Sequence, residues 1–271
     1  MGTLSRRRFL GVAASAAAIG ASGAIESTAH TRDPKHFLLV HGAWHGAWCW
    51  YKIVVGLEAA GHRVTTLDLP SGGIDGTPPE TVTLQAQADR VVAVLDALSE
   101  PVILVGHSAG GPVISLAAEA RPRAIEKLVY LTAFLLPDGG SQVAVVGRDP
   151  ESLIAKHLLF HPEGTIDVDP AWRRAVFYAD CDDRDVALAQ SLLKPNGLRP
   201  STDPVHVGSN FASVRRFYIT CRHDRAISPS AQQSMYTALP CEMVLPIASS
   251  HSPFFSHPEA LLRALAKIAR A

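Results

Sequence analysis

The pentapeptide Gly106-His107-Ser108-Ala109-Gly110 has the pattern G-x-S-x-G, which can surround a nucleophilic serine. It lies between a continuous apolar run, residues 101–106, and a helix-like stretch, residues 109–120. A sharp turn from a strand into a helix presents the serine hydroxyl at a sheet edge, and flanking glycines remove the Cβ clashes of such a turn. We therefore expect Ser108 to act as a nucleophile.

A serine hydroxyl needs a base that removes its proton and an acid that orients the base. In strand-turn-helix sites of this kind the acid follows the serine in the chain, and the histidine follows the acid. Asp224 stands directly after the strand-like run 217–221. Its neighbours Arg222 and Arg225 leave open that it is a surface carboxylate in a turn, but its position favours the acid.

His251 follows the apolar run 244–247, so it occupies the loop where the base is expected. The rival is His257, six residues further on, which directly precedes Pro258. Proline is common at the first position of a helix, so a structural place at a helix start suits His257 better. We therefore predict that Ser108, Asp224 and His251 form a catalytic triad.

Acyl transfer also needs backbone N–H groups that stabilise the oxyanion. We expect one from Ala109, directly after the nucleophile, and one from Ala43 in the turn His41-Gly42-Ala43-Trp44. His41 and His45 are four residues apart, as in a helical metal pair, but they follow a strand and have no evident third ligand. We expect neither a metal nor a cofactor.

The elements that must position these residues alternate between strand-like and helix-like segments, which predicts an α/β fold with a mostly parallel sheet covered by helices on both faces. The expected strands are 36–41, 63–69, 101–106, 127–133, 216–221 and 242–247. The expected helices are 50–60, 81–99, 109–120 and 258–269.

The interval 135–214 interrupts this alternation, so we interpret it as a cap inserted over the carboxyl edge of the sheet, with helices at 151–160 and 183–193. Its aromatic residues could line a substrate pocket or form the core of the cap, and the sequence leaves both open. They are Phe160, Trp172, Phe177 and Tyr178. We expect His157 and His161 to be solvated.

The composition is that of an ordinary globular enzyme. The 271 residues are 47% hydrophobic and 18% charged, and the formal net charge is zero. A chain without a basic surface has no electrostatic attraction for nucleic acid. The expected partner is a small, neutral molecule, bound by one domain that spans residues 30–271.

The N-terminus has the parts of an export signal: Ser5-Arg6-Arg7-Arg8-Phe9-Leu10 precedes an uncharged run, residues 11–24. The paired arginines are typical of twin-arginine signals, and the run is shorter than the roughly 20 residues of a membrane span. We predict a signal peptide over residues 1–29, cleaved after Ala24 or Ala29, and a periplasmic or secreted enzyme with no stable membrane span. An uncleaved signal anchor and a basic cytosolic N-terminus are the alternatives.

Four cysteines could pair in three ways in an exported protein. No CxxC or Cys/His ligand spacing is present, so we expect most of them to be small buried hydrophobes. They are Cys49, Cys181, Cys221 and Cys241.

Beyond these patterns, the chain resembles the plant methyl salicylate esterase and hydroxynitrile lyase family and its bacterial relatives. The segments that carry the resemblance are 36–52, 57–62, 105–108, 185–189 and 213–216. The resemblance implies a capped α/β-hydrolase fold that uses no cofactor and is frequently dimeric. It also implies the triad Ser108, Asp224 and His251, with Ala43 and Ala109 as oxyanion donors.

Two positions separate the chemistries within that family. Members that cleave cyanohydrins resemble one another in a threonine directly after the first-strand histidine and a lysine directly after the catalytic histidine. This chain has Gly42 and Ser252 instead. We therefore predict a serine carboxylesterase that hydrolyses small to medium hydrophobic or aromatic esters through an acyl-enzyme on Ser108. A hydroxynitrile lyase and a ligand-binding protein without catalysis are the alternatives.

Overall fold

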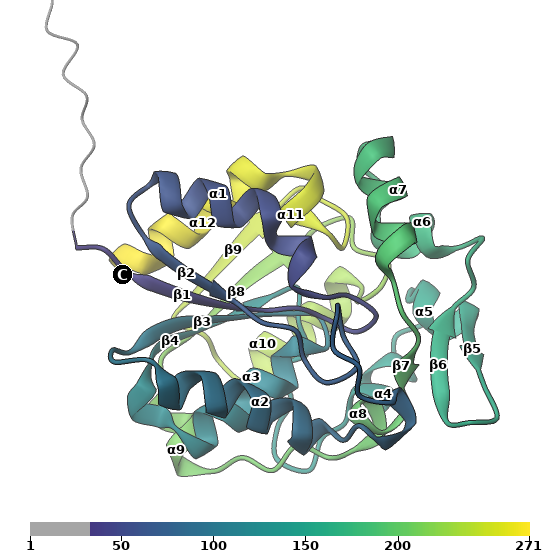
Figure 1. Cartoon of the computed structure of the whole chain (residues 1–271), viewed down its shortest axis with the longest axis horizontal. Coiled ribbons are helices and arrows are strands. Elements are labelled where there is room, and N and C mark those ends of the chain that lie inside the picture. Colours follow the sequence, from purple (N-terminus) through teal and green to yellow (C-terminus); the bar gives the residue numbers. More distant parts are fainter. Residues whose placement is uncertain (1–32) are drawn as a thin grey trace, which may run out of the picture. The chain divides into compact units, whose positions relative to one another are not determined.

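A computed structural model describes residues 33–271, so the predicted signal peptide lies outside the described residues. Six parallel strands form one sheet in the order β2-β1-β3-β4-β8-β9 (Figure 1). The strands are β1 His36–Val40, β2 Arg63–Thr66, β3 Val102–His107, β4 Ile125–Leu131, β8 Arg216–Cys221 and β9 Met243–Ile247. The predicted parallel α/β sheet is confirmed.

The central strands are buried on both faces, as their continuous apolar sequences predict. Along β3, Val102 and Leu104 pack into one apolar cluster, while Ile103 and Val105 pack into a second cluster. Successive side chains of a strand point to opposite faces, so each face of the sheet has its own core.

Helices cover both faces (Figure 1). One face carries α1 Tyr51–Ala59, α11 Pro253–Ser256 and α12 Pro258–Arg270, and the other carries α2 Leu84–Ala97, α3 Gly110–Ala120, α9 Ser209–Ser213 and α10 Pro229–Ala238. The closing helix α12 packs against the sheet through one apolar side, because its buried residues Leu261, Leu265 and Ile268 recur at helical spacing. Three short 3₁₀ helices complete the frame: η1 Ala47–Trp50, η2 Pro79–Thr81 and η3 Pro122–Ala124.

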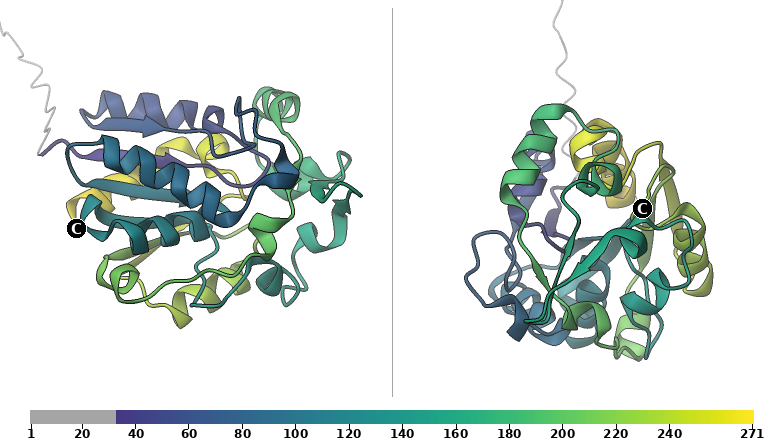
Figure 2. Two further views of the ribbon diagram at one scale, coloured as in Figure 1. Left: turned by 60° about the horizontal axis from the view of Figure 1, so that its bottom comes forward. Right: turned by 90° about the vertical axis from the view of Figure 1, so that its right-hand side faces the viewer.

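Residues 135–214, which we call the cap segment, connect β4 to β8. The part of the segment up to α8 lies at the carboxyl end of the sheet, whereas α9 returns to pack against α3 and η3 (Figures 1 and 2). The segment contains a three-stranded antiparallel sheet in the order β5-β6-β7 and several short helices besides α9. The elements are α4 Gln142–Val146, α5 Leu153–His157, β5 Leu158–Phe160, β6 Thr165–Val168, α6 Arg173–Phe177, α7 Asp183–Leu192, β7 Asn196–Gly197 and α8 Arg199–Thr202.

The helix expected at 151–160 is wrong in its second half. Ser152 caps α5 by accepting a hydrogen bond from Ala155 N, but the helix ends at His157. Residues 158–160 then pair with β6 in antiparallel register. Pairing with a strand distant in sequence overrode the local helical pattern, which periodicity in a single segment cannot reveal.

Two further findings concern the described part of the chain. None of its helices combines the length and apolar character needed to cross a bilayer. Its four cysteines are unpaired, and all but Cys241 are buried, in agreement with their expected place among the small apolar residues.

The turn between β3 and α3 holds Ser108 at a φ of 53°, in the left-handed region. The turn brings backbone segments together, so there is no space for side chains at the motif glycines. A Cβ at Gly106 would lie 2.8 Å from Gly110 O, and a Cβ at Gly110 would lie 2.8 Å from His41 O. The glycines of the motif are therefore required by close backbone approach.

We predict that Gly106→Ala lowers the free energy of unfolding by about 1–3 kcal/mol, because the new methyl group must displace backbone atoms. Gly76→Ala is the matched control, since a Cβ at Gly76 meets no atom within 4 Å. Urea unfolding of both variants measures the difference. Equal stabilities would contradict the close packing of this turn.

Candidate active site

The three predicted triad residues follow three different strands and gather at the carboxyl edge of the sheet. Ser108 follows β3, Asp224 lies in the loop after β8, and His251 lies in the loop after β9. All three are buried, with 4%, 4% and 1% of their surfaces exposed. Their convergence is a consequence of parallel strand direction, because all these strands end at the same edge.

Asp224 and His251 form a buried hydrogen-bonded pair. His251 Nδ1–H donates to Asp224 Oδ2 at 2.7 Å, and the Thr132 hydroxyl donates to the same carboxylate oxygen. The other oxygen, Oδ1, accepts the backbone N–H groups of Ala226 (2.7 Å) and Ile227 (3.0 Å). The carboxylate accepts the Nδ1 proton and thereby fixes the imidazole tautomer with its proton on Nδ1.

These contacts exclude the alternative in which Asp224 is a surface carboxylate. The flanking Arg222 and Arg225 are exposed, whereas the Asp224 side chain points into the protein. Gln232 on α10 supports the loop, since its amide donates to Ile227 O at 2.8 Å and reaches Asp224 Oδ2 at 3.5 Å.

Ser108 stands at the start of α3, beside the two amides expected to bind an oxyanion. Within residues 33–271, neither Ala43 N nor Ala109 N donates a hydrogen bond to another backbone group, so both remain available to a ligand. Within the same range the structure contains no hydrogen bond between Ser108 Oγ and His251. Such bonds are often long without a bound substrate.

The loop that carries His251 is held from two sides. His107, inside the serine motif, donates from Nε2 to His251 O at 2.9 Å, and the two rings lie 4.6 Å apart between centroids. From the cap segment, Asp180 accepts a hydrogen bond from Ser250 N at 2.8 Å. The histidine therefore depends on both the serine turn and the cap segment for its position.

His257 has different surroundings. It is the N-cap residue of α12 and is partly exposed, with Nδ1 2.9 Å from Ser256 Oγ and 3.5 Å from Asp180 Oδ2. It makes no hydrogen bond to Asp224 within the described residues. The helix start expected from Pro258 is present, and His251 rather than His257 is paired with the carboxylate.

A second buried histidine orients the first-strand loop. His45 Nδ1–H donates to Ala43 O at 2.7 Å, and His45 Nε2 accepts the hydroxyl proton of Tyr178 at 2.7 Å. Burial lowers the pKa of His45 to about 3, against the opposing effect of its bond to Ala43 O. His45 is therefore neutral, and it connects the Ala43 peptide to the cap segment.

His41 is also a neutral, structural residue. Its Nδ1–H donates to Gly42 O at 2.8 Å, and its Nε2 accepts from Leu69 N at 3.0 Å. Burial lowers the pKa of the imidazole, and both nitrogens are occupied. Within residues 33–271 no group of three His, Cys, Asp or Glu side chains is placed to hold a metal ion.

An apolar pocket opens beside Ser108. Its cavity volume is about 50 Å³, several times the roughly 10–15 Å³ that one water molecule requires. Apart from Ser108, its lining comes from the first-strand loop, the N-cap residue of α3, Phe134 after β4, and the cap segment. The apolar residues are Ala43, Trp44, Ala109, Phe134, Val143, Val146, Ile154, Leu158, Ile166 and Leu198.

The cap aromatics whose place was left open do not line this pocket. Phe177 and Tyr178 are buried in the core of one sheet face, whereas Trp172 and Phe160 are exposed, at 40% and 68%. His157 is not simply solvated, because its ring stacks on Trp172 with centroids 3.6 Å apart.

Several supporting residues were not identified from the sequence. Thr132 could have been found, because it directly follows β4 and the residue after each parallel strand lies at the ligand edge. Gln232 and Tyr178 carry no comparable signal, since their partners are distant in the chain. The role of His107 was hidden by its place at a variable position of the motif.

Comparison with known proteins agrees with this fold. Residues 37–264 match the alpha/beta hydrolase family, and the chain belongs to this family. The chain is 35% identical over 254 residues to putative methylesterase 15 of Arabidopsis thaliana, covering 88% of this chain and 57% of that protein. It is 34% identical to salicylic acid-binding protein 2 of Nicotiana tabacum, covering 88% of this chain and 98% of that protein. The resemblance inferred from the sequence is confirmed.

The chain spans 57–65% of the length of the first three curated relatives that it matches. Among solved structures, a pyrethroid hydrolase from Sphingobium faniae is similar with a TM-score of 0.79 and 28% identity, covering 88% of this chain and 98% of that one. Tomato methylketone synthase I is similar with a TM-score of 0.79, 30% identity and the same coverage.

The neutral state of His45 predicts a pH dependence of stability. The ordinary pKa of histidine is 6.5 and that of buried His45 is about 3, so the unfolded chain binds a proton between these values that the folded chain rejects. Stability is therefore complete above about pH 6.5 and falls as the pH is lowered towards 3. At pH 5.5 this one group costs about 1.4 kcal/mol.

Urea unfolding at pH 7.5 and 5.5 measures the effect, with His45→Gln as the comparison. We expect the wild-type protein to lose about 1.4 kcal/mol more than the variant on acidification. His41 and His107 act in the same direction in both proteins, because burial also lowers their pKa values. An identical pH dependence in the two proteins would show that His45 titrates normally.

Proposed function

We propose that this protein is a serine hydrolase that cleaves carboxylic esters through an acyl-enzyme on Ser108. The observation that carries the proposal is the buried Asp224–His251 pair, 2.7 Å apart, beside a serine held at a left-handed strand-helix turn. The relatives named as methylesterases and the pyrethroid hydrolase support ester hydrolysis as the reaction.

In the acylation step, Ser108 Oγ attacks the ester carbonyl carbon while His251 Nε2 takes the hydroxyl proton. Asp224 keeps the other imidazole proton on Nδ1, which leaves Nε2 free to accept, and its negative charge stabilises the imidazolium that forms. The tetrahedral intermediate then collapses, and His251 returns the proton to the departing alkoxide. Water repeats the sequence to release the acid from Ser108.

The negative charge that develops on the carbonyl oxygen requires donors in fixed positions. Ala43 N and Ala109 N are the proposed donors, and Ala109 stands at the positive end of α3. A single donor of this kind contributes about a hundredfold or more in rate. His45 supports the arrangement by binding Ala43 O, which fixes the orientation of that loop.

The apolar pocket favours uncharged esters of small to medium size, with hydrophobic or aromatic groups. None of the residues that line it carries a charge, so a charged substrate group would lose its hydration without gaining a partner. Its volume of about 50 Å³ favours the small end of that range.

The hydroxynitrile lyase alternative is disfavoured at both positions that define it. A Cβ at Gly42 would lie 2.8 Å from the Cβ of Ser108, so a threonine at this position does not fit this backbone. Ser252 is fully buried and its hydroxyl has no hydrogen-bond partner within the described residues. No cation therefore stands after His251 to stabilise cyanide.

We also propose that residues 135–214 act as a cap over the site and that the enzyme is exported. The cap segment supplies most of the apolar pocket, which supports its role in substrate selection. The arginines and the uncharged run within residues 1–29 support passage through a twin-arginine pathway.

We predict that Ser108→Ala abolishes hydrolysis of p-nitrophenyl esters, with kcat reduced by about a thousandfold or more. The variant should remain folded, because alanine is smaller than serine and the Ser108 hydroxyl makes no hydrogen bond within residues 33–271. Steady-state kinetics beside circular dichroism test this. Undiminished turnover would remove the proposed nucleophile, and cyanide release from mandelonitrile by the wild type would favour the lyase instead.

We predict that His251→Ala lowers kcat by about a thousandfold or more, while His257→Ala changes it by less than about threefold. The two histidines are six residues apart, and only His251 is hydrogen-bonded to Asp224. His257→Ala is therefore the matched control, measured with the same ester. Equal losses, or a larger loss for His257→Ala, would mean that the base is misassigned.

A further inference from the structure

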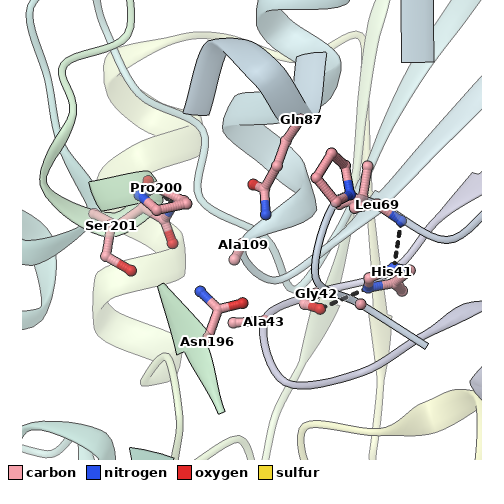
Figure 3. A pocket seen from close by; sticks show the side chains of 12 residues that line it. His41, Gly42, Ala43, Leu69, Gln87, Ala109, Asn196, Pro200 and Ser201 are labelled. Atoms are coloured by element: carbon pink, nitrogen blue, oxygen red, sulfur yellow. Dashed lines mark hydrogen bonds between the residues drawn. The ribbon is translucent and has the colours of Figure 1, made fainter. Parts of the chain in front are cut away.

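A second, smaller cavity lies next to the apolar pocket (Figure 3). It shares Ala43, Ala109, Gln142 and Ser201 with the apolar pocket, so the two cavities meet at the proposed oxyanion donors. Its volume is about 10 Å³, which is the space that one water-sized group requires. Unlike the apolar pocket, it is lined by several amide side chains.

Gln87 is the most unusual of these residues. It lies on the buried face of α2, between the apolar residues Leu84 and Val91, and only 7% of it is exposed. Its side-chain amide points into the small cavity (Figure 3) and makes no hydrogen bond to any other residue in the range 33–271. A largely buried amide without a partner in the protein is unfavourable, so this position favours a ligand that supplies the partner.

The cap segment contributes the opposite wall. Gln142 donates its amide to Pro200 O at 2.9 Å, and Asn196 donates its amide to Gly197 O at 3.0 Å. One N–H of each amide is thereby occupied, while the second N–H and the side-chain carbonyl oxygen remain available to a ligand. Figure 3 shows Asn196 facing the cavity from the side opposite Gln87, with Ala109 between them and Ala43 beside Asn196.

The lining limits the chemistry of the group that binds. None of the lining residues is Asp, Glu, Lys or Arg, and burial keeps His41 neutral by lowering its pKa. A carboxylate or an ammonium would therefore have no counter-charge. A hydroxyl or keto oxygen fits, because Gln87 can donate to it and the side-chain oxygens can accept a hydroxyl proton.

The position of the cavity limits where this oxygen sits on the substrate. The ester carbonyl binds Ala43 N and Ala109 N, and these same residues line the cavity. The added oxygen must therefore be close to the carbonyl, on carbon 2 or carbon 3 of the acyl chain.

We propose that Gln87, with Asn196 and Ser201, forms a polar subsite that selects esters of 2- or 3-hydroxy acids, or the corresponding keto acids. The inference rests on the proposed esterase function, and it deepens that function by naming the substrate class. The apolar pocket then receives the remainder of the acyl or alcohol part, while the subsite binds one uncharged oxygen.

The test compares ethyl butyrate with ethyl 2-hydroxybutyrate and ethyl 3-hydroxybutyrate, hydrolysed in a pH-stat. The quantity compared is the ratio of kcat/KM for each hydroxy ester to kcat/KM for ethyl butyrate. Gln87→Met removes the amide at nearly constant volume. Gln85→Met is the matched control on the same helix, because Gln85 is exposed and binds only Asp89.

We expect Gln87→Met to lower the ratio about tenfold or more for at least one hydroxy ester, while Gln85→Met leaves the ratio unchanged. Ser201→Ala should also lower this ratio. If Gln87→Met does not fold, the ratio measured for Ser201→Ala tests the subsite instead. An unchanged ratio in both variants would overturn the subsite. Equal losses on all three esters would also overturn it, since Gln87 would then assist the oxyanion or the fold.

Binding to Ser108→Ala separates this inference from the proposed function. Calorimetric titration of that variant with the same three esters, with and without Gln87→Met, measures preference without turnover. If a hydroxy ester binds more tightly than ethyl butyrate and this preference disappears with Gln87→Met, the subsite is supported. If the wild type nevertheless hydrolyses none of the three esters, only the esterase proposal fails. Equal affinity for all three esters would overturn the subsite.

Discussion

The left-handed turn at Ser108 is the constraint on which the site depends. A non-glycine residue in this conformation costs about 1–3 kcal/mol and persists only where its surroundings hold it. Here the Ser108 carbonyl accepts hydrogen bonds from Gly111 N and Phe134 N, both at 3.1 Å. The same turn leaves the Ala109 amide without a backbone partner in the range 33–271 and starts α3. The strain in one residue thus fixes the positions of both the proposed nucleophile and one of the two proposed oxyanion donors.

Electrostatically, the site contains one buried charge among neutral imidazoles. The Asp224 carboxylate accepts hydrogen bonds from two backbone N–H groups, from Thr132 and from His251. His45 and His107 are buried without an acidic partner, and burial lowers the pKa of each. Two histidines therefore serve as uncharged hydrogen-bonding supports, while His251 alone is placed next to a carboxylate that can stabilise its protonated form.

The positions of Ser108, Asp224 and His251 could be predicted because each follows an apolar strand, and parallel strands end at one edge. The same reasoning could not locate partners supplied by distant segments. Strand β5 was mistaken for the end of a helix because its pairing with β6 is a tertiary contact. Gln87 was not identified within its amphipathic helix. The reason for a polar residue on the buried face becomes clear only when the residues on the opposite side of the cavity are known.

The bonds between the cap segment and the first-strand loop have an evolutionary consequence. Trp44 receives a hydrogen bond from Lys194 N at 3.1 Å and donates one to Ile166 O at 3.0 Å, while Tyr178 binds His45. The cap therefore shares its anchoring points with the loop that carries Ala43. A chimera that borrows only the cap of a relative would lose these anchors. New specificities in this lineage would arise most readily when loop and cap are inherited together as one recombining block.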